Sequence, residues 1–170
     1  MRDKTTWGYR AVFIWVGTHG GPSAVTYSPR IRHDAVEDFF NQHRVWGGAP
    51  ATARQIEAFK KKSLTWSLFS AAPAGEQDAV DLPAEESWLE ARLTRLAEHA
   101  LARLQTNSDL EVLLDEIEGH DIEHELAIYA VLNRKQEGKA RCADLLADET
   151  IQQNAELLEY VRRCQLFFDH

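Results

Sequence analysis

Cysteine and long apolar runs are scarce in this sequence, which narrows the classes of protein that it can encode. Its two cysteines, Cys142 and Cys164, lie inside helical sequence patterns, so we expect reduced, packed thiols and no framework of disulfide bonds. The longest apolar stretch, residues 11–16, is far too short to cross a bilayer. The first ten residues also lack the apolar run of a signal peptide. A cytoplasmic protein that does not enter a membrane is therefore expected.

The familiar signatures of catalysis and of nucleotide binding are missing as well. The sequence contains no Gly-x-Ser-x-Gly element and no legible Ser-His-Asp or Cys-His arrangement. It also lacks the glycine and lysine spacing of a phosphate-binding loop. We therefore expect no cofactor and no nucleic-acid partner. These absences favour a binding protein over an enzyme, with an enzyme that uses an inconspicuous site as the alternative.

Charge is distributed unevenly along the 170 residues, which carry a formal net charge of −8. Residues 1–70 contain ten Lys and Arg against five Asp and Glu, whereas residues 71–170 contain nine against twenty-two. The extreme is segment 109–125, which has eight acids and neither Lys nor Arg. Because a surface of one sign steers partners of the opposite sign, this segment predicts a basic partner.

The first 71 residues predict a small antiparallel sheet of about three strands, accompanied by two short helices. Segments 9–17 and 24–28 are rich in β-branched and aromatic residues and flank a turn with two glycines and a proline, which predicts a hairpin. Pro29 is expected to end this hairpin or to mark a sheet edge, because proline cannot donate to a strand ladder. Residues 64–71 alternate apolar and polar side chains, as in a strand with one buried face.

Capping-box spacings locate the two short helices. Asp34 stands three residues before Glu37, and Thr52 stands three residues before Gln55. We expect Asp34 and Thr52 to cap the helices that follow them. The apolar side chains that these helices would bury are Val36, Phe39, Phe40, Ile56 and Phe59.

Residues 72–83 have the composition of a linker, and residues 84–170 predict a helical half. A long helix is expected over about 83–105. Ser108 and Glu111 then form a further capping box. Four connected antiparallel helices are predicted over 109–118, 121–134, 137–147 and 150–168. The fold class is thus α+β, a small antiparallel sheet packed on a helical bundle with one shared core.

The stretch "GHDIEHE" contains His-x-x-Glu-His, from His120 to His124, which matches the signature of inverted zinc peptidases. A helical zinc pair needs both histidines on one face of one helix. Gly119 is expected to end one helix and Asp121 to cap the next, which places His120 outside the helix and makes His124 a partly buried core histidine. We therefore predict no metal, and a metal-dependent enzyme that uses His120, Glu123 and His124 is the alternative.

Two other groups are candidates for binding. Arg30 and Arg32 share a strand face, with His33 close by, and such a group can hold a phosphate or carboxylate. An enzyme that binds an anion at these three residues is therefore a second form of the enzyme alternative. Trp46 lies in a glycine-rich loop and is the tryptophan most expected to be exposed, as the anchor of an interface. Together with the acids of segment 109–125, it gives the predicted partner surface: Trp46, Asp109, Glu111, Asp115, Glu116, Glu118, Asp121, Glu123 and Glu125.

The layout of the chain resembles that of small uncharacterised bacterial proteins, some of which are assigned to toxin–immunity loci. The similarity lies in a hairpin that runs into "SPRIRHDAVEDFF" and in a helical tail that holds "HELAIYAVLNRKQEGKARCADLL". It covers most of the chain and implies a cytoplasmic binding protein, without implying a role for any single residue. With the acidic segment, it predicts an immunity-type inhibitor of a basic bacterial toxin or effector, and an effector chaperone or adaptor is the alternative.

Overall fold

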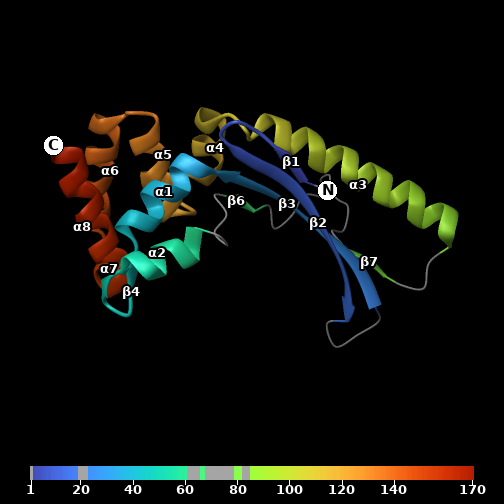
Figure 1. Ribbon diagram of the computed structural model, residues 1–170, viewed down its shortest axis with the longest axis horizontal. Helices are drawn as coiled ribbons and strands as arrows, with labels where there is room; N and C mark the ends of the chain where they lie inside the picture. The colour runs from blue at the N-terminus through green and yellow to red at the C-terminus, as the bar shows by residue number, and fades with distance from the viewer. Residues whose placement is uncertain (1, 19–22, 61–65, 68–78, 82–84) are drawn as a thin grey trace. The chain divides into compact units, whose positions relative to one another are not determined.

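The computed structural model describes residues 2–18, 23–60, 66–67, 79–81 and 85–170 (Figure 1). It confirms the α+β class, with an antiparallel sheet and a helical C-terminal part. The chain forms two compact units, each built from two segments. Unit 1 contains Met1–Arg32 and Trp66–Asp109, and unit 2 contains His33–Thr65 and Leu110–His170. The division therefore does not fall at the predicted linker, since each unit takes residues from both sides of it.

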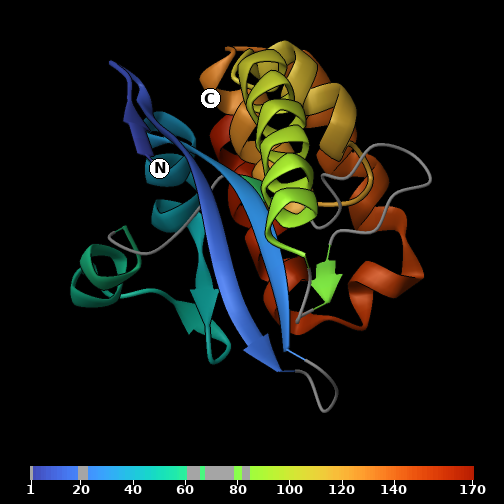
Figure 2. The same ribbon diagram turned by 90° about the vertical axis from the view of Figure 1, so that its right-hand side faces the viewer.

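Unit 1 contains a five-stranded antiparallel sheet (Figure 2). The order is β1-β2-β3-β6, and β7 also pairs with β3. The neighbouring long strands β2 and β3 confirm the predicted hairpin, and its turn residues 19–22 lie outside the described residues. The strands are β1 (Arg2–Lys4), β2 (Gly8–Thr18), β3 (Ser23–His33), β6 (Trp66–Ser67) and β7 (Ala79–Asp81).

The structure corrects two expectations about this sheet. Of the two alternatives for Pro29, the end of the strand is wrong, because β3 continues to His33. Its edge pairs with β7 at Ala24–Thr26 and with β6 at Arg30 and Ile31, so Pro29 falls between two short partners, where its missing N–H is tolerated. The predicted linker 72–83 contains strand β7, which its loop-like composition concealed. Of the predicted strand 64–71, only β6 lies within the described residues.

The long helix of unit 1, α3 (Glu86–Thr106), contacts β2. It begins three residues later than predicted and ends one residue later. Its buried side chains recur at four-residue intervals, which is the spacing of one helix face. The buried residues are Arg92, Leu96, Ala100 and Leu104. Trp88, near the start of the helix, is 52% exposed.

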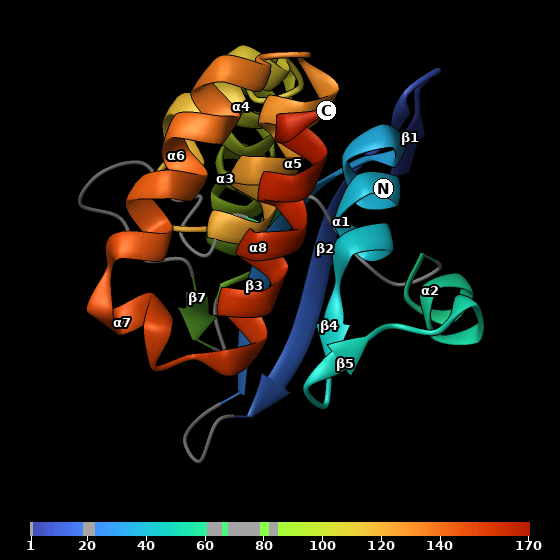
Figure 3. The ribbon, with the colours of Figure 1, turned by 90° about the vertical axis from the view of Figure 1, so that its left-hand side faces the viewer.

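Unit 2 is mainly helical (Figure 3). Helix α1 packs on α5, α5 packs on α6 and α8, and α6 packs on α8. The largest apolar side chains in its core come from α1, α4, α5 and α8. The elements are α1 (Asp34–His43), β4 (Val45–Trp46), β5 (Ala49–Pro50), α2 (Ala53–Lys60), α4 (Leu110–Ile117), α5 (Ile122–Val131), α6 (Lys135–Ala147), α7 (Glu149–Gln152) and α8 (Ala155–Asp169).

The helix starts agree with the capping predictions in part. Thr52 and Gln55 form the predicted reciprocal box, because the Thr52 N–H donates to Gln55 Oε1 at 2.8 Å and the Gln55 N–H donates to Thr52 Oγ1 at 3.4 Å. Asp34 does not cap α1, because strand β3 runs directly into the helix and His33 occupies the cap position without a side-chain hydrogen bond. Ser108 donates its hydroxyl to the Leu104 carbonyl of the preceding helix.

The last predicted helix, 150–168, is divided into α7 and α8. The Asn154 side chain accepts the Leu157 N–H at 3.1 Å and thereby caps α8. A break at this point lets the long α8 take a direction of its own against α6. In the described part of the chain, no helix has both the length and the apolar composition that a membrane span requires.

Candidate functional site

The "GHDIEHE" stretch folds as a helix break. Gly119 has φ +76°, a left-handed conformation that glycine adopts without strain, and it follows the end of α4. Asp121 is the N-cap of α5, and its carboxylate accepts the His124 N–H at 3.2 Å. His120 is exposed and precedes the helix. The predicted break is confirmed, and the two histidines do not share a helix face.

His124 lies between two carboxylates in unit 2. Its Nδ1 is 2.8 Å from Asp121 Oδ2, and its Nε2 is 3.2 Å from Glu37 Oε1 on α1. Burial alone would lower the pKa of His124, but the hydrogen bonds with Asp121 and Glu37 outweigh it and raise the pKa to about 10. The ring is therefore a buried imidazolium that donates from both nitrogens. In this state it has no lone pair for a metal.

Glu125 does not fit its predicted place in the partner surface. Its side chain is fully buried and receives two hydrogen bonds from Arg141, at 2.5 Å from Nε and 3.1 Å from Nη2. It also accepts the Gly119 N–H at 3.1 Å. The negative charge is thus neutralised by an arginine on the next helix. Glu125 belongs to the core of unit 2 and is not a partner-binding residue.

The other acids do not form one continuous unpaired patch either. Glu111 receives a hydrogen bond of 2.8 Å from Arg134, and the Asp121 carboxylate is hydrogen-bonded to the His124 ring. Asp109 is the last residue of unit 1, whereas the rest of the segment belongs to unit 2. Asp115 and Glu118 are exposed on and just after α4, and Glu116 is half-buried. The sequence contained no signal for these pairs, because each arginine follows its acid by 16 or more residues.

Trp46 is exposed as predicted, with 51% of its surface accessible. It lies at the β4–β5 turn, where Gly47 and Gly48 have φ +62° and +78° and so form a tight hairpin. One side of the indole packs near Phe59, at 5.3 Å between ring centroids. The Arg44 guanidinium lies 5.4 Å from the Trp46 ring and 4.3 Å from the Phe59 ring. These contacts hold the indole in place while half of it faces solvent.

Helix α8 fixes the same hairpin to the rest of unit 2. The Gly47 N–H donates to Glu156 Oε1 at 2.8 Å, in the first turn of α8. One turn further along α8, Tyr160 donates its hydroxyl to the Glu123 carbonyl at 2.8 Å. Helix α8 therefore contacts both the hairpin that holds Trp46 and the first turn of α5 that holds Glu123.

Glu156, which the sequence did not single out, binds the hairpin of Trp46 and also acts on Glu123 through its charge. Burial raises the pKa of Glu123, the negative charges of Asp121 and Glu156 act in the same direction, and His124 and Arg44 oppose them. The Glu156 carboxylate is therefore close enough to Glu123 for its negative charge to raise the pKa of Glu123. We call the residues Trp46, Phe59, Glu123 and Glu156 the Trp46 surface.

The predicted anion group does not belong to this surface. Arg30 and Arg32 lie on one face of β3 in unit 1, whereas His33 has the opposite strand parity and belongs to unit 2. Arg32 is buried, and burial lowers the pKa of His33 although Asp34 opposes that shift. All three residues already make interactions within the protein. An anion site at these residues stays a prediction.

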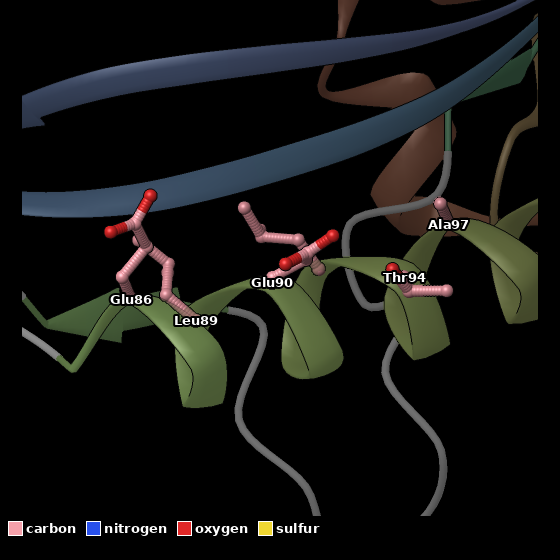
Figure 4. A pocket seen from close by; sticks show the side chains of 6 residues that line it. Glu86, Leu89, Glu90, Thr94 and Ala97 are labelled. Atoms are coloured by element: carbon pink, nitrogen blue, oxygen red, sulfur yellow. The ribbon is translucent and has the colours of Figure 1, made fainter.

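A hollow of about 630 Å³ lies along α3 in unit 1 (Figure 4). Its lining within the described residues comes from one helix, where two glutamates stand one turn apart beside apolar side chains. An open hollow over a single helix does not gather reactive groups from several elements. The lining residues are Glu86, Leu89, Glu90, Leu93, Thr94 and Ala97.

Comparison with protein-family models, curated proteins and solved structures finds no match to this chain. Among the described residues, no three His, Cys, Asp or Glu side chains gather in a way that holds a metal ion. Geometry and charge are therefore the basis for the function, and the Trp46 surface is the candidate site.

Proposed function

We propose that the chain is a protein-binding module, a cytoplasmic inhibitor of the immunity type that binds a basic toxin or effector through the Trp46 surface. The observation that supports it is Trp46 itself, an indole that is 51% exposed on a hairpin held by Phe59, Arg44 and Glu156. A large aromatic side chain that is exposed yet fixed in place is the type of residue that anchors protein interfaces.

Preorganisation makes this anchor effective. Binding orders flexible side chains and loops, and the entropy lost in that process weakens the complex. The Gly47–Glu156 hydrogen bond and the Phe59 contact fix the hairpin before any partner arrives. A partner that covers Trp46 therefore gains apolar burial at a small cost in entropy.

Inhibition follows from the charge of the surface. Toxins that act on polyanionic substrates carry basic sites, and an acidic protein can occupy such a site and speed its own association by long-range attraction. The metal-dependent alternative at His120, Glu123 and His124 has less support, because both ring nitrogens of His124 face carboxylates. An effector chaperone would use the same surface, and inhibition of the partner distinguishes the two functions.

Affinity capture from the native cells, with Trp46→Ala and Trp88→Ala as matched variants, tests the proposal. Both tryptophans are about half exposed, but Trp88 lies on α3 in unit 1. We expect one basic protein to be retained by the parent and by Trp88→Ala and to be lost with Trp46→Ala. Titration calorimetry with that protein should show a loss of about 2 kcal/mol or more, roughly 30-fold in affinity, for Trp46→Ala.

The same partner should lose its activity when the parent protein is added. Equal retention by both variants, or the absence of any basic protein that depends on Trp46, would refute the binding function. Circular dichroism of each variant checks that the fold is kept.

A further inference from the structure

The chemistry of the partner can be narrowed from the charges around Trp46. The ionised groups that act on Glu123 are Asp121, Glu156, His124 and Arg44. His124 is already shared by Asp121 and Glu37, and the Arg44 guanidinium is surrounded by the rings of Phe40, Trp46 and Phe59 at 4.3–5.4 Å. Glu37 is fully buried, and both Glu37 and Asp121 pair with His124, so these three groups pair among themselves within unit 2. Of the remaining groups, the exposed Glu156 and the partly exposed Glu123 carry two negative charges against the one positive charge of Arg44, which leaves a net negative charge next to Trp46.

Trp46 adds a second, independent feature. An indole face is the best aromatic partner for a cation, and half of this indole is still open to solvent. Arg44 shows that a guanidinium already packs against this ring from within the protein, at 5.4 Å from its centroid. A second guanidinium on the open side would meet the same ring chemistry together with the carboxylates of Glu123 and Glu156.

We infer that the partner inserts an arginine side chain at the Trp46 surface, where it stacks on Trp46 and pairs with Glu123 and Glu156. This inference rests on the proposed function. An arginine fits better than a lysine, because its planar fork pairs with two carboxylates and stacks on an aromatic ring at the same time. Recognition would then depend on these two acids and not on Asp115 and Glu118 of segment 109–125.

Charge-removing variants with unchanged shape separate the two sets of acids. In Glu123→Gln/Glu156→Gln, the amide carbonyl introduced on α8 can still accept the Gly47 N–H, so the hairpin stays fixed. In Asp115→Asn/Glu118→Gln, the same number of charges is removed from exposed positions of the acidic segment. Both double variants raise the net charge by the same amount, so a general electrostatic effect would weaken binding equally in both.

The probe is an acetylated hexa-arginine peptide, with hexa-lysine and hexa-glutamate peptides as comparisons. Its binding is followed by the indole N–H signal of Trp46 in ¹H–¹⁵N spectra, which Trp46→Phe assigns. We expect hexa-arginine to shift this signal, hexa-lysine to bind more weakly and hexa-glutamate to have no effect. The Glu123/Glu156 double variant should weaken hexa-arginine binding at least tenfold more than the Asp115/Glu118 double variant does.

Equal weakening in the two double variants, or hexa-arginine binding that leaves the Trp46 signal unchanged, would overturn the inference. These outcomes are distinct from failure of the proposed function. If Trp46→Ala abolishes capture of the natural partner while the Glu123/Glu156 double variant binds it normally, the binding function stands and the arginine assignment is wrong.

Discussion

Glu125 illustrates, at the scale of single residues, how a charged side chain can belong to the core. Its carboxylate is fully buried, and Arg141 and the Gly119 N–H provide all three of its described hydrogen bonds. One of these bonds comes from Gly119, which follows the end of α4, and the other two come from Arg141 on α6. A single side chain thus ties a helix break to the next helix.

Replacing Glu125 by alanine should destabilise unit 2 by about 3 kcal/mol, because it leaves the partly buried Arg141 without its counter-charge. Urea unfolding followed by circular dichroism measures this change. The paired substitution Glu125→Leu/Arg141→Met should cost clearly less than Glu125→Ala, since it removes both charges and keeps apolar volume. If the paired variant is as unstable as Glu125→Ala, the backbone bond to Gly119 is the main contribution and the ion pair is not.

Local residue patterns account for the features that could be predicted from sequence. The turn at Gly119, the cap at Asp121 and the capping box at Thr52 depend on residues within three or four positions, and the structure contains all three. Glu37 and Glu125 were not recognised as buried, because their partners His124 and Arg141 lie 87 and 16 residues away. Sequence patterns of acidic residues cannot distinguish a solvated acid from one that meets a distant cation.

At the scale of elements, α1 and α5 are joined by a charged histidine. His124 has a pKa of about 10 in the folded protein, whereas an unperturbed histidine titrates near 6.5. Because the folded pKa is the higher one, the resulting stability is fully present below about pH 6.5 and is lost as the pH rises through about 10. The helix pair should therefore weaken in mildly alkaline solution.

The prediction is that His124→Gln removes this pH dependence. Between pH 6.5 and 10, the free energy of unfolding of the parent should fall, relative to the variant, by an amount on the order of a few kcal/mol. Urea unfolding at several pH values measures the difference between the two proteins, which cancels the titration of other groups. Parallel curves for parent and variant across that range would mean that His124 is neutral in the folded state.

Helices α6 and α8 approach each other at a glycine. A Cβ atom built on Gly138 would lie 2.5–2.9 Å from three carbons of the buried Phe168 ring. Gly138→Ala should therefore destabilise the protein by about 1–2 kcal/mol, because the clash exceeds the gain of about 1 kcal/mol in helix propensity. Thermal unfolding gives the value.

The matched control removes the ring. In a Phe168→Ala background the same Gly138→Ala change meets no obstacle, so it should become neutral or stabilising through helix propensity alone. An equal cost in both backgrounds would show that the glycine is required for a reason other than contact with Phe168.

At the scale of the whole molecule, each unit is discontinuous in sequence, and this bears on which fragments can fold. Unit 2 needs α1 and α2 from His33–Thr65 as well as the helices of Leu110–His170. The sequence favoured a boundary at 72–83 because composition changes there. Composition reports where polar residues concentrate, but not which distant segments pack together, so the division into units was not predictable in this way.

A fragment of residues 84–170, the predicted helical half, should not unfold cooperatively. It lacks Val36 and Phe40, which are buried in the whole chain, and it lacks Glu37, which pairs with His124. A chain that joins 33–65 to 110–170 through a flexible Gly-Ser linker should keep dispersed amide signals and a single thermal transition. Native-like signals from the 84–170 fragment would show that α1 is dispensable for the helical core.

The separation of α1 from α5 also sets an order of events during synthesis on the ribosome. Translation adds about 5–20 residues per second, so the 87 residues between Glu37 and His124 delay their meeting by roughly 4–17 seconds. Helix α8 follows every other element of unit 2, and it holds the hairpin through Glu156 and Glu123 through Tyr160. Chains that stop before α8 would therefore display Trp46 without the hydrogen bond from Glu156, and only a chain extended through α8 would present the whole Trp46 surface to a partner.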